Sequence, residues 1–293
     1  MADIRKLRVG LVFGGRSGEH EISLRSARSV VHAIDRSKYD ITLIGIDHDG
    51  GWQLLDESEF AALTAVDNSA VVDSGRPVAM LPVPAQSKSI PIAGANAPTL
   101  DVVFPILHGP YGEDGSIQGF LDLADLPYVG AGVLGSAVGM DKDVQKRLLR
   151  DAGLPVLPFD TVSRARHDRN AGAVAAAAAA LGYPVFVKPA NLGSSVGVSK
   201  VDAAEDLDAA VALAFAYDNK IVIERGIAAR EIECAVLGND EPEASVPGEI
   251  EANASFYSYA AKYIDPPSAG NASPLATPTP VIISRDVQSG RTR

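Results

Sequence analysis

The sequence predicts an α/β protein whose N-terminal part contains a mostly parallel, doubly wound sheet. The first observation is that short apolar runs alternate with stretches of helical periodicity, as they do in parallel sheets with crossover helices. The second is that a glycine-rich turn at residues 14–18 follows the first apolar run. The end of a strand is where open α/β sheets bind their ligands, so this turn is a candidate site.

The elements expected in this part are strands at 7–13, 41–46 and 102–107 and helices at 19–35 and 115–125. Each strand is a short apolar run. The first helix places most of its apolar residues on one face: Ile22, Ala27, Val30, Val31 and Ile34. Glu113 and Asp114 precede the second helix and complement its dipole. Residues 56–98 are rich in small and turn-forming residues and are expected to be surface loops around short strands.

A second unit is expected to begin near Gly139. Its expected elements are helices at 141–152, 171–181 and 203–217 and strands at 184–188, 220–224, 230–237 and 243–251. The last three strands follow one another closely, which favours an antiparallel sheet. Residues 266–293 show little periodicity and are expected to form an irregular tail.

Composition narrows the class of protein. The formal net charge of −11 argues against a broad nucleic-acid interface or an anionic-membrane surface. No apolar run reaches about 18 residues and no signal region opens the chain, so we expect a cytoplasmic protein. Cys234 is the single cysteine; it lies in an apolar run and is expected to be buried and inert. The five histidines lack the spacing of a zinc site.

The segment KPANLGSSVGVS at residues 188–199 carries the strongest chemical signal. Lys188 ends an apolar strand, and a loop of small residues follows. Glycines let backbone N–H groups approach a phosphate closely, and serines add hydroxyl donors. In a P-loop the lysine follows the glycines instead. A strand lysine before a Gly/Ser loop resembles the ATP-grasp superfamily, although an ordinary hairpin is the alternative for this segment alone.

Other segments make the resemblance specific: GGRSGEHEISL at 14–24, HGPYGEDGSIQG at 108–119, MDK at 140–142 and FYSYAAKY at 256–263. In this order they resemble the D-alanine–D-alanine ligase family over about residues 5–265. The resemblance implies an ATP-grasp fold. Its expected parts are an N-terminal doubly wound parallel sheet at 1–138, a central α+β lobe at 139–224, an incomplete C-terminal antiparallel lobe at 225–265 and an atypical tail at 266–293.

The resemblance also implies the reaction. ATP would activate the carboxylate of one D-alanine as a D-alanyl phosphate, and the amine of a second D-alanine would attack it, giving D-alanyl-D-alanine for peptidoglycan precursors. Lys142 and Lys188 are expected to contact the ATP phosphates. The rest of the expected ATP site comprises Ser195, Glu224, Arg225, Gly226, Ile227, Glu231 and Tyr257. For Lys142 and the two glutamates, ordinary surface charges are the alternative. The family resemblance further implies a homodimer formed through the N-terminal lobe.

The expected substrate residues are Glu19, Ser194, Tyr263, Lys262 and His108. By resemblance, the Glu19 carboxylate pairs with the ammonium group of the first D-alanine, and Ser194 and Tyr263 hydrogen-bond with Glu19. His108 helps to place the carboxylate of the first substrate. Lys262, on the same loop as Tyr257 and Tyr263, reaches the γ-phosphate, and closure of this loop excludes water. A helix-terminal acid is the alternative for Glu19.

The end of the chain departs from the family pattern. The family binds Mg²⁺ (or Mn²⁺) through late acidic and amide residues, and a late arginine stabilises the reaction intermediate. Only Asp265 and Asp286 follow Tyr263 as acids, so we assign no metal ligand. Ala260 also stands where the family loop often has Glu. We therefore expect a truncated chain of impaired activity.

Three other readings stay open. A dinucleotide-dependent oxidoreductase would use the turn at 14–18, but its glycines do not give GxGxxG, and a nicotinamide site needs neither Lys142 nor Lys188. A non-catalytic protein that binds ATP or an amino acid would fit the missing metal ligands. A D-alanine–D-lactate ligase is the third, although Tyr263 favours the dipeptide.

Overall fold

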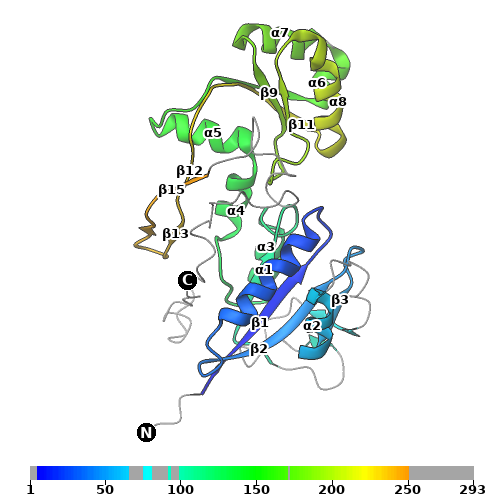
Figure 1. The fold of residues 1–293 in the computed structure, drawn as a ribbon, viewed down its shortest axis with the longest axis vertical. Coiled ribbons are helices and arrows are strands. Elements are labelled where there is room, and N and C mark those ends of the chain that lie inside the picture. Colours follow the sequence, from blue (N-terminus) through cyan, green and yellow to red (C-terminus); the bar gives the residue numbers. More distant parts are fainter. Residues whose placement is uncertain (1–4, 66–74, 81–91, 94–98, 171, 251–293) are drawn as a thin grey trace. The chain divides into compact units, whose positions relative to one another are not determined.

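The computed structural model describes residues 5–65, 75–80, 92–93, 99–170 and 172–250. The chain forms two compact units, and the boundary between them falls after Ala137, inside helix α4 (Val133–Met140). Each unit has its own sheet and its own core, and each is described by itself (Figure 1). No helix in the described ranges is long and apolar enough to cross a membrane.

The sheet of the first unit has the strand order β4-β3-β2-β1-β7. Its strands are β1 (Leu7–Gly14), β2 (Tyr39–Ile46), β3 (Trp52–Leu55), β4 (Arg76–Pro77) and β7 (Val102–Leu107). β1 pairs in parallel with both β2 and β7, whereas β3 and β4 add an antiparallel edge. The parallel strands expected at 7–13, 41–46 and 102–107 are therefore confirmed, within a mixed sheet.

Helices cover both faces of this sheet, because alternate residues of β1 point to opposite sides. Leu11 and Phe13 pack with apolar residues of α1 (His20–Ala33) and α2 (Glu57–Ala65). Val12 belongs to the opposite core with residues of α3 (Ser116–Leu123). Figure 1 shows α1 lying along β1 and β2. The sheet is thus doubly wound, as the sequence predicted.

Helix α2 corrects the expectation that residues 56–98 are only loops around short strands. Phe60 and Leu63 are almost fully buried and lie three residues apart, so one face of this short helix packs on the sheet. Alanines and acidic residues surround these two residues, so the segment shows no clear helical periodicity of apolar residues. Short strands β5 (Ala79–Met80) and β6 (Ile92–Ala93) pair in the same region, as expected.

The second unit contains an antiparallel sheet with the order β10-β9-β11-β8. Its strands are β8 (Phe159–Ser163), β9 (Val185–Pro189), β10 (Ser199–Val201) and β11 (Lys220–Arg225). One face packs on α7 (Gly172–Leu181) and α8 (Leu207–Tyr217). The 3₁₀ turn Ala204–Asp206 directly precedes α8. Helix α6 (Arg164–Arg169) follows β8.

The other face of this sheet carries polar and aromatic side chains. Alternation in each strand turns Val162, Val187 and Ile223 towards α7 and α8. The next residue along each strand points the other way. Lys188 and Glu224 therefore face the opposite side of the sheet, where α5 (Lys142–Asp151) lies. Asp141 caps α5 by accepting hydrogen bonds from the N–H groups of Asp143 and Val144.

The last described strands are shorter than expected. Instead of continuous strands at 230–237 and 243–251, the chain forms β12 (Glu231–Glu233) paired with β15 (Gly248–Ile250), and β13 (Val236–Leu237) paired with β14 (Glu243–Ala244). The chain leaves strand geometry at Cys234 and Ala235. The expected antiparallel pairing is present, but in two separate ribbons.

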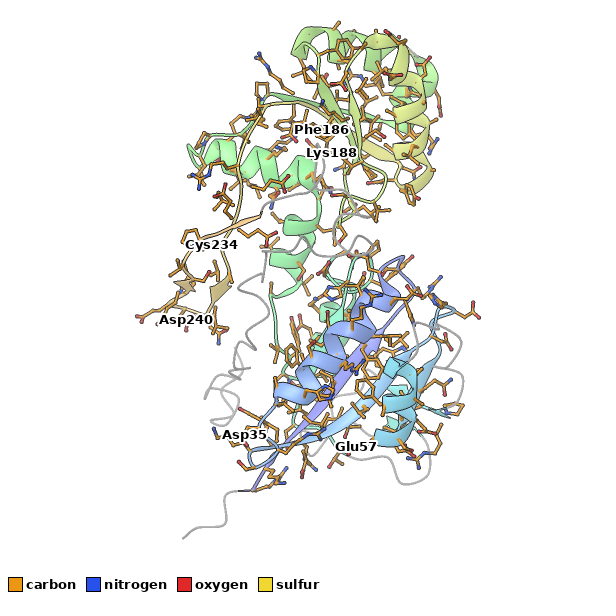
Figure 2. All side chains as sticks on the ribbon, in the orientation of Figure 1. Asp35, Glu57, Phe186, Lys188, Cys234 and Asp240 are labelled. Carbon is orange, nitrogen blue, oxygen red and sulfur yellow. The ribbon has the colours of Figure 1, made fainter. Side chains whose placement is uncertain are left out.

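Cys234 is exposed, so the expectation of a buried thiol is wrong (Figure 2). It lies between the two-stranded ribbons, and its apolar neighbours Ile232 in β12 and Val236 in β13 are exposed as well. An apolar run predicts burial only when another layer covers it, and a two-stranded ribbon does not supply that layer by itself. The expected tail at 266–293 lies outside the described residues.

Candidate active site

Two groups of predicted site residues assemble, one in each unit. In the second unit, β9 presents Lys188 near its end, and the loop of residues 190–198 follows. Ser194, Ser195 and Gly197 have φ values of 50°, 59° and 69°, in the left-handed region. Non-glycine residues rarely adopt this region, and such outliers cluster at ligand sites. The loop is therefore a tight, strained turn beside the lysine.

Gly197 is required for this turn. A Cβ atom at this position would lie 2.7 Å from Cδ2 of Tyr217 and 2.8 Å from Cγ of Pro189. The start of the loop is held by the Asn191 N–H, which donates to Asp218 Oδ2 at 2.8 Å. The loop geometry therefore depends on contacts with α8 and the segment after it.

Lys188 and Glu224 face each other across paired strands. Lys188 Nζ lies 2.5 Å from Glu224 Oε2, and Lys146 Nζ, from α5, donates to Glu224 Oε1. Glu224 is only 4% exposed. Burial alone would raise the pKa of Glu224, but the charge of Lys188 and the hydrogen bonds from both lysines outweigh it and lower the pKa. Glu224 is therefore an ionised acceptor between two ammonium groups.

Lys142 joins this cluster from the first turn of α5. Its backbone N–H donates to the Ala190 carbonyl at 2.9 Å, and its Nζ donates to the Leu192 carbonyl. The pKa of Lys142 is lowered to about 8, first because burial disfavours the charge and second because Lys188 repels it. Two half-buried ammonium groups beside a Gly/Ser loop form a candidate binding site for an anion such as a polyphosphate.

Ion pairs hold α5 against the sheet. Lys220 Nζ, at the start of β11, lies 2.5 Å from Asp141 Oδ2. Asp143 Oδ1 accepts from Thr161 Oγ1 at 3.0 Å and from Arg147 Nε at 2.6 Å. The Arg147 contact lies within α5, whereas the contacts from Lys220 and Thr161 join the helix to β11 and β8. Lys142 and Lys146 are four residues apart and therefore point towards the same side of the helix.

The remaining predicted ATP residues follow Glu224 along the chain. Arg225 ends β11, and the Gly226 N–H donates to the Pro184 carbonyl at 2.8 Å. Ile227 is 53% exposed, and Glu231 begins the separate strand β12. The structure therefore brings Lys142, Lys188 and Glu224 together, with the serine loop beside them. Tyr257, Lys262 and Tyr263 lie outside the described residues.

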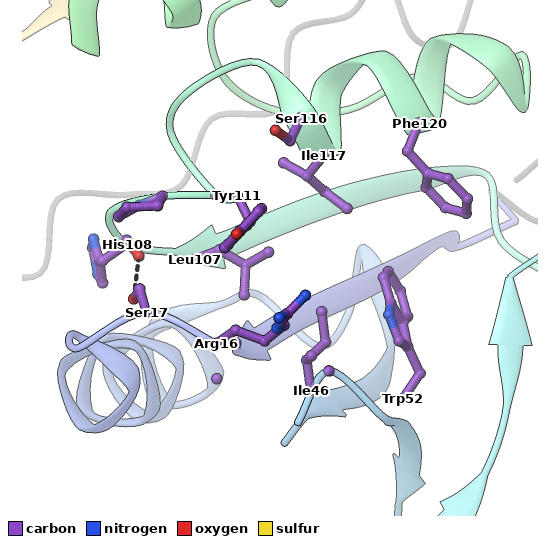
Figure 3. A pocket seen from close by; sticks show the side chains of 15 residues that line it. Arg16, Ser17, Ile46, Trp52, Leu107, His108, Tyr111, Ser116, Ile117 and Phe120 are labelled. Atoms are coloured by element: carbon purple, nitrogen blue, oxygen red, sulfur yellow. Dashed lines mark hydrogen bonds between the residues drawn. The ribbon is translucent and has the colours of Figure 1, made fainter. Parts of the chain in front are cut away.

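In the first unit, Glu19 and His108 lie at the ends of neighbouring parallel strands. Glu19 is 4% exposed and follows the turn after β1. Ser17 connects the two segments: its hydroxyl donates to the His108 carbonyl at 2.7 Å and accepts from the Glu19 N–H at 3.1 Å (Figure 3). Ser17 therefore brings Glu19 close to the start of the 108–119 segment.

Glu113 orients the loop after β7. Its carboxylate accepts from the Gly109 N–H at 2.8 Å and lies 3.4 Å from Nδ1 of His108, whose Nε2 lies 3.0 Å from Ser26 Oγ. Burial would raise the pKa of Glu113, but hydrogen bonds from His108 and Gly109 outweigh it and lower the pKa. The imidazole is thus fixed from both sides, which suits a substrate-positioning role.

A cavity of about 200 Å³ opens between these two loops. Its walls include Leu107, Trp52 and Phe120, and the Arg16 guanidinium lies 5.2 Å from the ring centre of Tyr111 (Figure 3). The cavity is large enough for a small amino acid. It lies at the carboxyl ends of parallel strands, where open α/β sheets bind ligands.

Three residues of these sites were not predicted from the sequence: Lys146, Glu113 as a partner of His108, and Ser17. Lys146 could have been found, because it follows Lys142 by four residues in an expected helix. The other two make contacts that only the packing of separate loops creates. Glu19 and Ser194 belong to different units, so their predicted contact stays a prediction.

No group of three or more potential metal ligands (His, Cys, Asp or Glu) exists within the described ranges. The described residues therefore do not form a site for the Mg²⁺ that the family resemblance implies. Asp265 and Asp286 lie outside these ranges.

The antiparallel sheet with its strand lysine, strained Gly/Ser loop and helix-borne lysine defines an ATP-grasp protein. The sequence matches two protein-family models, "D-ala D-ala ligase N-terminus" at residues 8–131 and "D-ala D-ala ligase C-terminus" at residues 148–281. The chain therefore belongs to the D-alanine–D-alanine ligase family, whose ATP-dependent, ADP-forming members make D-alanyl-D-alanine for peptidoglycan synthesis.

Individual relatives agree with this assignment. The chain is 51% identical over 276 residues to D-alanine–D-alanine ligase A of Escherichia coli K12, covering 93% of this chain and 75% of the relative. The D-alanine–D-alanine ligase of Coxiella burnetii superposes with a TM-score of 0.73 at 41% identity, covering 84% of this chain and 68% of that one. VanG D-Ala:D-Ser ligase of Enterococcus faecalis also gives 0.73, at 36% identity, covering 87% and 73%.

Proposed function

We propose that this chain joins two D-alanine molecules and converts ATP to ADP and phosphate, through a D-alanyl phosphate. The observation that carries the proposal is the cluster of Lys142, Lys188 and Glu224 beside the strained serine loop. Family membership supports D-alanine as the substrate, because neither the charge of the site residues nor their spacing in the sequence identifies D-alanine.

In the proposed reaction, the two lysines bind the ATP phosphates and neutralise the transferring phosphoryl group. Ser195 contributes a loop donor, Glu224 holds Lys188 in the ATP site, and the segment Arg225–Ile227, with Glu231, contacts the adenosine. The chain must also hold the first D-alanine with its carboxylate towards the γ-phosphate, because loss of orientation costs most of the rate.

Glu19 is proposed to pair with the ammonium group of the first D-alanine, and His108 to place its carboxylate. The buried position of Glu19 and the two-sided fixation of His108 support these roles. Ser194, Tyr257, Lys262 and Tyr263 keep their predicted roles in ordering and closing the site. Attack by the amine of the second D-alanine then forms the peptide bond and releases phosphate.

Three broader proposals accompany this one. A homodimer through the N-terminal unit follows from the family resemblance, and light scattering after size exclusion tests it. The reaction is proposed to take place in the cytoplasm, where ATP is available, and Mg²⁺ is proposed as the ion that accompanies ATP. Fractionation of cells that express the chain tests the cytoplasmic location, and a metal titration of turnover tests the requirement for Mg²⁺.

The deciding experiment measures ADP release and D-alanyl-D-alanine by mass spectrometry, with ATP and D-alanine. Parallel reactions use L-alanine, no amino acid, or Lys188→Met, and all three should be inactive. D-Serine and D-lactate as second substrates test the neighbouring specificities, one of which is named for the Enterococcus enzyme. Binding of ATP without any dipeptide would contradict the proposal and favour a non-catalytic nucleotide-binding protein.

A further inference from the structure

The carboxylate of Glu224 is shared by two lysines from different elements. Lys188 on β9 binds Oε2, and Lys146 on α5 binds Oε1. The side chains of Lys188 and Lys146 are 22% and 17% exposed, and that of Glu224 is 5% exposed. All three charges are therefore largely removed from water, so the state of one affects the others strongly.

Each lysine also has its own aromatic neighbour. Phe159 and Phe186 occupy the strands on either side of Glu224, directly opposite it in register. Lys146 Nζ lies 5.6 Å from the ring centre of Phe159, and Lys188 Nζ lies 5.3 Å from that of Phe186. Figure 2 labels Phe186 and Lys188 on β9. Because the two lysines use different oxygens and different rings, either can move without displacing the other.

The proposed function gives these two lysines different tasks. Lys188 must point to a phosphate of ATP, and it then contributes less to Glu224. A buried carboxylate that loses its cation is strongly disfavoured. Without a second cation, Glu224 would compete with the phosphate for Lys188.

We propose that Lys146 is a positioning residue of the nucleotide site, which keeps Glu224 neutralised and in place while Lys188 binds a phosphate. The proposal rests on the proposed function for the role of Lys188. Lys146 acts through Glu224 and has no contact of its own with the phosphates. Its loss is therefore expected to weaken binding of ATP, whose phosphates use Lys188, and to leave binding of adenosine nearly unchanged.

The test measures dissociation constants for ATP and adenosine by titration calorimetry. Lys146→Met is expected to weaken ATP binding by about tenfold or more, as for loss of one partner of a buried charged pair. Lys146→Arg should restore most of the affinity. The matched control is Lys200→Met on β10, whose partner Asp202 is exposed and which should bind as the wild type does.

A double-mutant cycle with Glu224→Gln separates an action through Glu224 from direct contact. Once Glu224 is neutral, Lys146→Met should have little further effect on ATP affinity. An equal loss in both backgrounds would overturn the proposal, as would wild-type ATP affinity in Lys146→Met or equal losses for ATP and adenosine. Circular dichroism checks that each variant is folded. If Lys146→Met alone is unfolded, the double variant Glu224→Gln/Lys146→Met, which removes both charges, is compared with Glu224→Gln instead.

These readouts do not depend on dipeptide formation. ATP binding with no D-alanine-dependent turnover would contradict the proposed function and leave the role of Lys146 measurable. Turnover with an unchanged ATP affinity in Lys146→Met would contradict only the role of Lys146. Absence of ATP binding by the wild-type chain would contradict both.

Discussion

The Glu19 carboxylate packs directly against the backbone of Gly109. A Cβ atom at position 109 would lie only 2.6 Å from Glu19 Oε2, and Gly109 has a φ of 71°. This contact connects the segment after β1 with the segment after β7. It therefore links the two residues that are proposed to hold the first substrate, Glu19 and His108.

Gly109→Ala is expected to displace the Glu19 carboxylate. The variant should raise the KM for D-alanine by about tenfold, as for misplacement of a charged binding group, while ATP affinity stays unchanged. Steady-state kinetics with each substrate checks this. Gly153→Ala is the matched control, since Gly153 has a φ of 77° but nothing within 4 Å of its Cβ position. Equal effects of both variants would mean that backbone strain, not the contact, is responsible.

The lowered pKa of Lys142 predicts pH-dependent nucleotide binding. The ammonium loses its proton as the pH rises through about 8. ATP affinity should therefore fall above that pH and stay level below it, down to the range in which ATP itself is protonated. In Lys142→Arg the side chain stays charged, so this fall should be absent. Dissociation constants between pH 7 and pH 9.5 decide the point, and the same fall in Lys142→Arg would assign it to another group.

Asp101 is expected to stabilise the first unit. It accepts from both Arg8 (2.6 Å, to Nη2) and Arg5 (2.8 Å). Burial would raise the pKa of Asp101, but the contacts with Arg8 and Arg5 lower it from 3.8 to about 2. The stabilisation is therefore present above the unfolded pKa and is lost as the pH falls from about 3.8 to 2.

Asp101→Asn should lower the free energy of unfolding at pH 7 by about 1–2 kcal/mol, a value that allows for solvent screening. Urea unfolding at pH 7 and pH 3 measures the effect, which should shrink at the lower pH. Asp40→Asn is the control, because Asp40 pairs with Lys6 on the surface at 3.6 Å. A similar loss in both variants would contradict the assigned role of the Arg8 contact.

His20 is expected to make the first unit sensitive to mild acid. It is fully buried, its Nδ1 lies 2.8 Å from the Gly15 carbonyl, and its ring stacks on His48 at 3.9 Å. Burial is the main cause of its lowered pKa, and His48 adds to it, whereas Gly15, Glu21 and Asp47 oppose it. A folded-state pKa below the unfolded value means that stability is lost as the pH falls below about 6.5.

The melting temperature of the wild type should therefore decrease between pH 7 and pH 5. In His20→Gln this decrease should be smaller, although the variant is less stable at pH 7 by about 1–3 kcal/mol, because a buried hydrogen bond is lost. His32→Gln, at the exposed end of α1, should behave as the wild type does. An unchanged pH dependence in His20→Gln would show that another group titrates.

The expected fold was confirmed where local sequence carries the information. Short apolar runs predicted β1, β2, β7, β9 and β11, and glycines predicted the ends of two helices: Gly153 and Gly182 both have a φ of 77° just after α5 and α7. Helix α2 and the exposure of Cys234 were not predicted. Both depend on whether another layer covers a segment, which no local pattern contains.

The sequence by itself determined the strand–loop–helix order, the position of Lys188 before its Gly/Ser loop, and the family resemblance. These features depend on side-chain periodicity and backbone preferences over a few residues. Only the tertiary structure decided that Lys146 and Lys188 share Glu224, 78 and 36 residues away along the chain. Strand register and the rotation of α5 set these pairings, and both depend on packing between segments that are distant in sequence.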